Sequence, residues 1–336
     1  MDAAGIRKVI ESLKAQFNQD KEHDMKIVRE YCETLTDSSQ DQAILAAVAR
    51  FAAHEYPDAE ANQRAEKLGL AISKFHERID ELQKMAAERR FEEAAAGYAE
   101  ILGEMDPVEL DDRRLMSFNQ PFEELLFRMR DKDGRPIVRI SNLAEILYYQ
   151  YASILFELRR YADAREQLEK CLKLDPVDMR VYFELAELAK LDQNFELVSE
   201  LMAKVHPLIF TRRGLARYYR TQAFIENMRG NFRLAVAMVY VSLDYEESPV
   251  ARAQLNALAK IKGTDLSRPK VEEVQALVQG TNIVLGPDQD VYGLAIAIGG
   301  RARVQNPGLA RMAFAIAYDI THYKPLLREL AALGVK

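Results

Sequence analysis

Residue types that build covalent cross-links and metal sites are scarce: the 336 residues include two cysteines and five histidines. Two cysteines, Cys32 and Cys171, cannot make the disulfide framework of a small secreted domain, and they are compatible with a reducing compartment. The histidines lie far apart, with no HExxH motif and no carboxylate or paired cysteines at metal-ligand spacing. The sequence therefore predicts no metal site and no cofactor.

Long hydrophobic runs are absent as well. No window approaches the roughly 18 uninterrupted apolar residues of a transmembrane helix. Residues 1–19 carry Asp2, Arg7, Glu11 and Lys14 among their apolar positions, so they lack the hydrophobic core of a signal peptide. We therefore expect a cytoplasmic protein with no membrane partner.

Positive charge is in deficit, with a net charge of −6 and a pI near 5.6. The molecule as a whole therefore has no field that attracts nucleic acids or acidic membranes, and nucleic acid is not an expected partner. The glycine pair at 299–300 belongs to neither a GxGxxG nor a phosphate-binding motif, and no nucleophile elbow or triad order occurs. We expect no catalytic residues and no enzymatic activity.

The sequence does contain a repeated pattern of aromatic and small residues, first complete over residues 145–178. An apolar stripe with three- and four-residue spacing runs through residues 143–159, and a second stripe ends at Asp175-Pro176, where proline stops a helix. Two helices joined by so short a turn must pack antiparallel. The layout returns 34 residues after Tyr148, and a third copy follows three residues late. The recurring positions are Tyr148, Tyr151, Ala152 and Tyr161, then Tyr182, Leu185, Ala186 and Phe195, then Tyr219, Ala223, Phe232, Ala235 and Leu243.

This order of residues resembles the tetratricopeptide repeat (TPR) family over residues 145–249. The resemblance implies an all-α fold, a right-handed TPR-like superhelix of stacked helix pairs, and it implies a fold more than a function. The matching positions are Tyr148 for the family's tryptophan, Ala152 for its glycine, Ala164 for its invariant alanine and Pro176 for its closing proline, while Tyr151 and Leu155 depart from the usual leucine and tyrosine.

The repeats divide the chain into three predicted parts. Residues 1–74 are expected to form an N-terminal helical cap or degenerate repeats, 75–249 the TPR-like repeats, and 250–336 degenerate repeats with a capping helix. Three helix pairs are expected, with small residues buried where the helices cross. The pairs cover residues 143–174, 180–205 and 215–243, and the small residues are Ala152, Ala164 and Ala186.

Residues 108–141 interrupt the repeats, because they carry no TPR pattern. Apolar residues on both sides of Asp133-Gly134 predict a small β-hairpin or an ordered loop near residues 121–141. A calcium loop is the alternative, but Met129 and Ile140 occupy the places of its first ligand and its bidentate glutamate. Insertions in helical repeats often contribute to binding.

In the TPR family the first helix of each unit faces an inner groove. The resemblance therefore implies that three helices of this chain line such a groove. Six arginines and one acidic residue lie between positions 211 and 233 of an otherwise acidic chain. These arginines could pair with neighbouring carboxylates and cover apolar surface, or they could bind an acidic or C-terminal peptide. The predicted groove residues are Tyr149, Ser153, Phe156, Arg180, Phe183, Arg217, Arg220, Phe224 and Asn227, with Ile146, Glu187 and Lys190 beside them.

The groove does not match the two-carboxylate clamp of TPR co-chaperones. Tyr149, Ser153, Glu184 and Thr221 stand where the clamp has its lysine, asparagines and last arginine, and only Arg217 fits. We therefore expect a non-catalytic scaffold or adaptor that binds another protein or peptide, possibly an acidic one. A peptide-sensing regulatory TPR protein and a helical-repeat RNA-binding protein are the alternatives. The sequence leaves the oligomeric state open.

Overall fold

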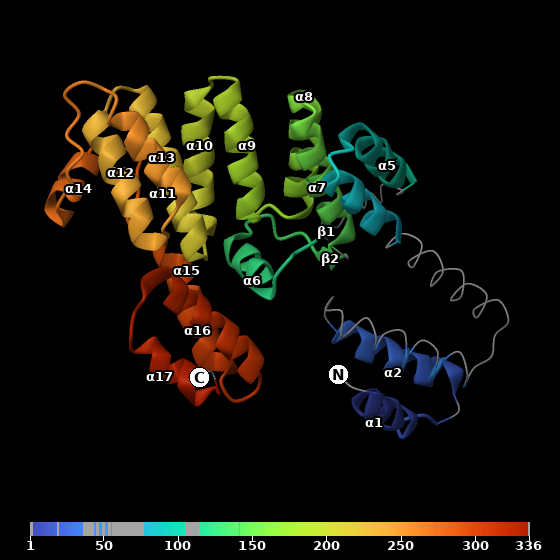
Figure 1. The fold of residues 1–336 in the computed structure, drawn as a ribbon. Coiled ribbons are helices and arrows are strands. Elements are labelled where there is room, and N and C mark those ends of the chain that lie inside the picture. The colour runs from blue at the N-terminus through green and yellow to red at the C-terminus, as the bar shows by residue number, and fades with distance from the viewer. Residues whose placement is uncertain are drawn as a thin grey trace. The chain divides into compact units, whose positions relative to one another are not determined.

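The computed structural model describes residues 3–18, 20–35, 77–104, 114–140 and 142–334, together with 44, 47–48, 51–52 and 55 (Figure 1). The chain divides into two compact units, Met1–Pro107 with Ser141–Ala144, and Val108–Ile140 with Glu145–Lys336. Among the described helices, none combines the length and the apolar character that a membrane span requires.

The first unit begins with two amphipathic helices, α1 (Ala3–Lys14) and α2 (Lys21–Glu33). Asp20 caps α2, since its carboxylate accepts a hydrogen bond from the backbone N–H of His23 at 3.0 Å. The two helices bury Leu13 and Val28 in a small core with Ile44, Val48 and Ala52. Much of the predicted N-terminal cap, including residues 56–74, lies outside the described residues.

A helix pair ends the first unit. Residues 77–87 are helical, and α5 (Phe91–Glu104) follows after a short turn. A Cβ atom on Gly97 of α5 would lie 2.3 Å from Leu82, so the glycine allows the two helices to approach closely.

The second unit contains the three predicted helix pairs, and these predictions are confirmed. Ala152, Ala164 and Ala186 are 3%, 1% and 0% exposed, as expected for small residues at helix crossings. The paired helices lie side by side in Figure 1. The pairs are α7 (Leu143–Glu157) with α8 (Tyr161–Leu174), α9 (Met179–Leu191) with α10 (Phe195–Val205), and α11 (Arg212–Met228) with α12 (Phe232–Tyr245).

The helix pair of the first unit and the three predicted pairs of the second unit share one turn conformation. The sequence pattern marked this turn only by its aromatic residue. Two positions before that aromatic, the backbone enters the left-handed region. Only one of the four pairs uses glycine there, and the other three carry a side chain at some conformational cost. The left-handed residues are Arg89, Arg159, Gln193 and Gly230, and the aromatics after them are Phe91, Tyr161, Phe195 and Phe232.

Replacing Gly230 by alanine should lower the free energy of unfolding by about 1–2 kcal/mol, because φ is +81° at this position although space for a methyl group is free. Gly293 offers the matched control, since it lies inside a helix with ordinary φ and equally open space. Gly293→Ala should raise stability by roughly 0.8–1 kcal/mol. Urea unfolding measures both variants, and equal shifts of the same sign would contradict the assigned turn.

The insertion differs from the predicted hairpin. Strand β1 (Arg114–Met116) pairs in parallel with β2 (Ile137–Arg139), and helix α6 (Pro121–Arg130) connects them. The hairpin prediction was wrong because the run before Asp133-Gly134 is helical: it buries Phe122 and Leu126 on one face. Pro121 at the first turn, followed by glutamates, is a typical helix start that signalled α6.

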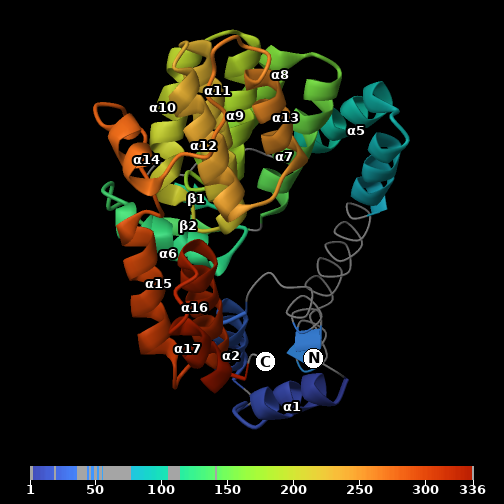
Figure 2. The same ribbon diagram turned by 60° about the vertical axis from the view of Figure 1, so that its left-hand side comes forward.

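Five helices follow the repeats: α13 (Pro249–Leu258), α14 (Val271–Val278), α15 (Gln289–Ala302), α16 (Pro307–Thr321) and α17 (Leu326–Ala332). Figures 1 and 2 show α15, α16 and α17 packed together, and α16 contacts α11. A Cβ on Gly299 would lie 2.6 Å from Phe314, which explains how closely α15 and α16 approach. Helix α17 lies in the segment where a capping helix was predicted.

Buried tyrosines of α11 form hydrogen bonds with the segment before α15. The Tyr218 hydroxyl accepts from the Val284 N–H at 3.1 Å, and the Tyr219 hydroxyl accepts from the Gly286 N–H at 2.6 Å. Nε2 of the buried His206 lies 3.0 Å from the Gly286 carbonyl oxygen. These bonds fix where α15 begins relative to α11.

Candidate functional site

Side-chain contacts join the predicted groove residues of α7, α9 and α11 into one surface, which we call the first-helix face. The residues of this face lie on the first helix of three successive pairs, so each contact spans about one repeat. The face consists of Tyr149, Ser153 and Phe156 on α7, Arg180, Phe183, Glu184, Glu187 and Lys190 on α9, and Arg217, Phe224 and Asn227 on α11.

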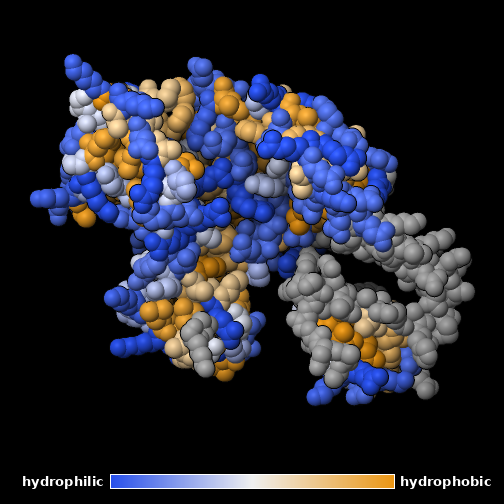
Figure 3. All heavy atoms as spheres, viewed as in Figure 1, coloured by the Kyte–Doolittle hydropathy of each residue, from blue (hydrophilic) through white to orange (hydrophobic). Residues whose placement is uncertain are grey.

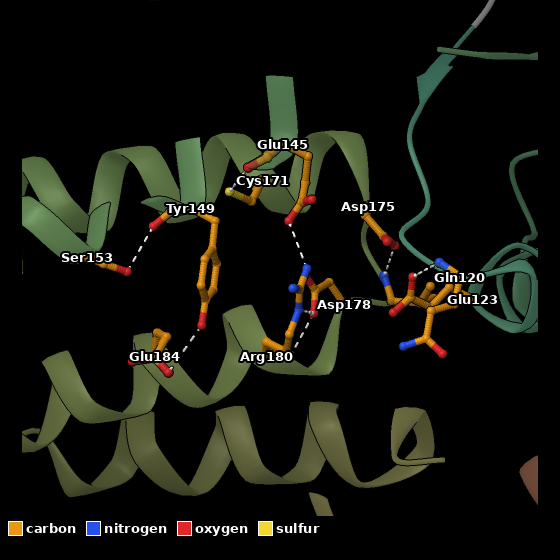
Figure 4. A network of polar contacts seen from close by, with 11 residues as sticks. Gln120, Glu123, Glu145, Tyr149, Ser153, Cys171, Asp175, Asp178, Arg180 and Glu184 are labelled. Carbon is orange, nitrogen blue, oxygen red and sulfur yellow. Dashed lines mark hydrogen bonds and ion pairs between the residues drawn. The ribbon is translucent and has the colours of Figure 1, made fainter. Parts of the chain in front are cut away.

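Tyr149 links α7 to α9. Its hydroxyl donates to Glu184 at 3.5 Å, and the Arg180 guanidinium lies 5.1 Å from its ring centroid (Figure 4). Burial, with the nearby Glu184 carboxylate, raises the pKa of the Tyr149 hydroxyl, so this hydroxyl keeps its proton and acts as a donor. Ser153, one turn further on, is exposed, and among the described residues its hydroxyl bonds only the Tyr149 carbonyl oxygen of its own helix.

Arg217 links α9 to α11 in the same manner. Its guanidinium lies 4.9 Å from the Phe183 ring and pairs with Glu184 at 3.0 Å and Glu187 at 3.8 Å. Phe183 is only 2% exposed beneath it, so this ring supports the face without being accessible to a ligand. The Lys190 Nζ lies 5.0 Å from the centroid of the Phe224 ring, so a second contact between a cation and an aromatic ring joins α9 to α11.

Arg220 does not belong to this surface. Its side chain is 13% exposed and pairs with Glu246, at the end of α12, at 3.2 Å. The interpretation that these arginines pair with neighbouring carboxylates is therefore confirmed for Arg217 and Arg220. Other arginines of this region are paired as well: Arg229 with Glu226, Arg233 with Glu273 and Asp265, and Arg213 with Glu246.

The aromatic residues at the ends of the face are partly open. Phe156 packs edge-on against Tyr161 with ring centroids 5.5 Å apart, and Phe224 lies 6.0 Å from Phe195. Asn227 is half-buried near the end of α11. The accessible part of the first-helix face is thus a charge-compensated strip with half-exposed rings and a small exposed hydroxyl.

A cluster of buried carboxylates lies at one end of this face, and sequence reasoning missed it (Figure 4). Glu123 of α6 is 2% exposed, and Glu145 of α7, Asp175 after α8 and Asp178 before α9 are each 0% exposed. Arg180 is the cation of the cluster, with Asp178 at 2.6 Å and Glu145 at 3.3 Å. We call these four acids the buried carboxylate cluster.

Backbone amides hold three of the four carboxylates. Glu123 accepts from the Gln120 N–H at 2.8 Å, Asp175 from the Val177 N–H at 3.1 Å, and Asp178 from the Arg180 N–H at 2.8 Å. These bonds also explain the local structure, because Asp178 caps α9. The cluster therefore joins the insertion helix α6 to the ends of α8 and α9.

One guanidinium does not neutralise four buried acids. Burial first, and then the Asp178 charge, raises the pKa of Glu123 and of Glu145 to about 7. Burial, followed by the Glu123 and Asp178 charges, raises the pKa of Asp175 to about 9. Burial likewise raises the pKa of the Cys171 thiol, which makes it an inert core residue and not a nucleophile.

Sequence comparison supports the repeat assignment. Residues 145–188 match the tetratricopeptide repeat family model, a segment that covers α8 and most of α7 and α9. A comparison with curated proteins gives no match. The fold and this match together define an all-helical repeat protein with a TPR segment, and TPR segments in general mediate protein–protein interaction.

Proposed function

We propose that this chain is a non-catalytic scaffold that binds a protein or peptide on the first-helix face. The observation that supports this proposal is the continuous row of contacts from Tyr149 through Glu184 and Arg217, which joins α7, α9 and α11 into one surface. A preformed surface over stacked helices suits recognition of an extended or helical segment, because little ordering entropy is lost on binding. The two free cysteines are consistent with a cytoplasmic location.

The charge pairing changes the kind of ligand that we expect. Arg217 already has two carboxylate partners, so an acidic ligand would have to displace Glu184 and Glu187. We therefore propose a ligand of mixed charge that packs on the half-exposed rings of Tyr149 and Phe224. Figure 3 shows hydrophilic side chains over most of the visible surface of α8–α12, with small apolar patches between them.

The other two candidate functions gain no specific support. RNA binding by this face requires unpaired cations beside stacking rings, whereas Arg217 is paired within the chain. A peptide-sensing regulator would need two arrangements of the helices, and the described contacts define one. We therefore propose the scaffold function alone.

A Ser153→Arg substitution should weaken partner binding at least tenfold, about 1.4 kcal/mol, because a long cation would stand among the exposed groups of the face. Its stability should hardly change, since the Ser153 hydroxyl bonds its own helix. A partner is first captured from native cell extract with the tagged chain. Calorimetry then measures the affinity of the purified partner for wild type and for each variant. The matched control is Ala203→Arg, at an exposed small residue of α10, the second helix of its pair. Equal affinities of the two variants would contradict the proposed face.

A further inference from the structure

A second potential binding site lies away from the first-helix face, where α15, α16 and α17 meet the ends of α11 and α12. It is an open pocket of about 900 Å³, a size common among small-molecule sites. Three tyrosines form its aromatic walls, and its basic groups come from two different elements. Its lining includes Arg212, Tyr245, Tyr292, His322, Tyr323 and Lys324.

Arg212 carries an uncompensated positive charge at this pocket. Its guanidinium donates to the Asp244 carbonyl oxygen at 2.8 Å and to the Tyr245 carbonyl oxygen, so it caps the C-terminus of α12. Its Nη1 also contacts Nε2 of His322. Among the described residues no carboxylate forms an ion pair with Arg212, unlike Arg217 and Arg220.

The arginine keeps capacity for a ligand. Three of its five N–H donors are used by these contacts, so two remain. The acids nearby are already bound elsewhere: the Asp244 carboxylate pairs with Arg268, and Asp319 accepts the backbone N–H of Arg212 at 2.6 Å. Neither forms an ion pair with the guanidinium.

Lys324 adds a second positive charge in the loop between α16 and α17. It is exposed, and in the described part of the chain it forms no ion pair. The chain bends sharply just before it, since His322 ends α16 in the left-handed conformation with φ +52°. This bend places His322, Tyr323 and Lys324 together along one wall of the pocket.

The tyrosines offer ring surface beside these cations. Tyr245 is half-buried and stacks on Tyr219 with ring centroids 5.6 Å apart and an interplanar angle of 17°, so its position is fixed from behind. Tyr292 is half-buried and Tyr323 is 54% exposed. Planar groups pack well on such rings, and anions pair with guanidinium and ammonium groups.

We propose that this pocket binds a small organic anion, with a carboxylate or phosphate group at Arg212 and Lys324 and a planar body against Tyr245, Tyr292 and Tyr323. This site is independent of the protein-binding function proposed for the first-helix face. A carboxylate and a phosphate both present oxygen acceptors to these donors. The probe that binds more tightly shows which of the two anionic groups the ligand carries.

The test titrates phenyl phosphate, benzoate and inorganic phosphate into the full chain by calorimetry. We expect one of the two aromatic anions to bind at least tenfold more tightly than inorganic phosphate. No saturable binding of any probe at 10 mM would overturn the proposal, and equal affinity for phenyl phosphate and inorganic phosphate would do the same, because the rings would then contribute nothing.

Two exposed residues allow the site to be mapped without loss of the fold. Lys324→Gln should weaken the aromatic anion at least fivefold, whereas Lys262→Gln, at an exposed lysine outside the pocket, should leave it unchanged. Tyr323→Ser should weaken the aromatic anion and spare inorganic phosphate. Equal effects of Lys324→Gln and Lys262→Gln would show that binding is non-specific and would overturn the assignment.

Discussion

Between pH 5 and pH 9 an Asp175→Asn variant should become progressively more stable than the wild-type chain. Asp175 is fully buried, and burial with the Glu123 and Asp178 charges raises its pKa to about 9. In the unfolded chain an aspartate has a pKa near 3.9. Between these two values the folded chain holds a proton that the unfolded chain has lost, so rising pH favours the unfolded state.

The size of this effect follows from proton linkage. The difference in unfolding free energy between variant and wild type should grow by up to about 1.4 kcal/mol per pH unit and level off near pH 9. Asparagine stays neutral, and its carbonyl oxygen can still accept the Val177 N–H. Urea unfolding followed by circular dichroism at pH 5, 6, 7, 8 and 9 measures the difference.

Subtracting the unfolding free energy of the wild type from that of the variant at each pH removes the contribution of the other titrating groups. Burial lowers the pKa of His206, so that group acts in the opposite direction on the acid side of neutrality in both proteins. Glu169→Gln, at an exposed acid of α8, is the control and should track wild type at every pH. If the stability of Asp175→Asn also followed that of wild type at every pH, the pKa of Asp175 would not be raised by burial as described.

Removal of the cluster's cation should be the most damaging single change. Arg180→Met leaves Asp178 and Glu145, both 0% exposed, without their partner at 2.6 and 3.3 Å. Breaking a fully buried pair from one side costs about 3–5 kcal/mol, because the remaining charge stays desolvated. The Arg180 side chain is 44% exposed, so solvent screening reduces the expected loss to about 2–3 kcal/mol. The loss should be smaller at pH 5 than at pH 8, since burial raises the pKa of Glu145 to about 7 and that group takes up a proton.

An exposed ion pair supplies the comparison for Arg180. Arg252 pairs with Glu247 at 2.8 Å, but both side chains are more than two-thirds exposed, at 68% and 69%. Arg252→Met should therefore cost no more than about 1 kcal/mol. Similar losses for both variants in urea unfolding would mean that the cluster does not depend on Arg180.

The sequence was sufficient to predict the helix pairs, because a period near 34 residues and small residues such as Ala164 report directly on helix crossings. It was not sufficient for the insertion, where α6 and a parallel strand pair depend on residues more than 20 positions apart, as in Arg114 opposite Ile137. Apolar residues around a turn cannot distinguish a local hairpin from strands that pair elsewhere.

The repeat pattern predicted which helices carry the candidate site residues, but it did not reveal the charged partners of those residues. Tyr149, Arg180 and Arg217 lie where the repeat pattern put them, yet their partners sit about one repeat away: Glu145 is 35 residues before Arg180, and Glu184 is 33 before Arg217. Comparing charges one period apart would have revealed these pairs. The burial of Glu123 had no such signal, because it follows from how α6 docks.

The first-helix face is tested most directly by photo-cross-linking to the bound partner. A benzophenone side chain in place of Ser153 stands among the exposed groups of this face, and one in place of Ala203 stands on α10, the second helix of its pair. Our account predicts an efficient cross-link to the partner from position 153 and little or none from position 203. A cross-link from position 203 with none from position 153 would contradict it.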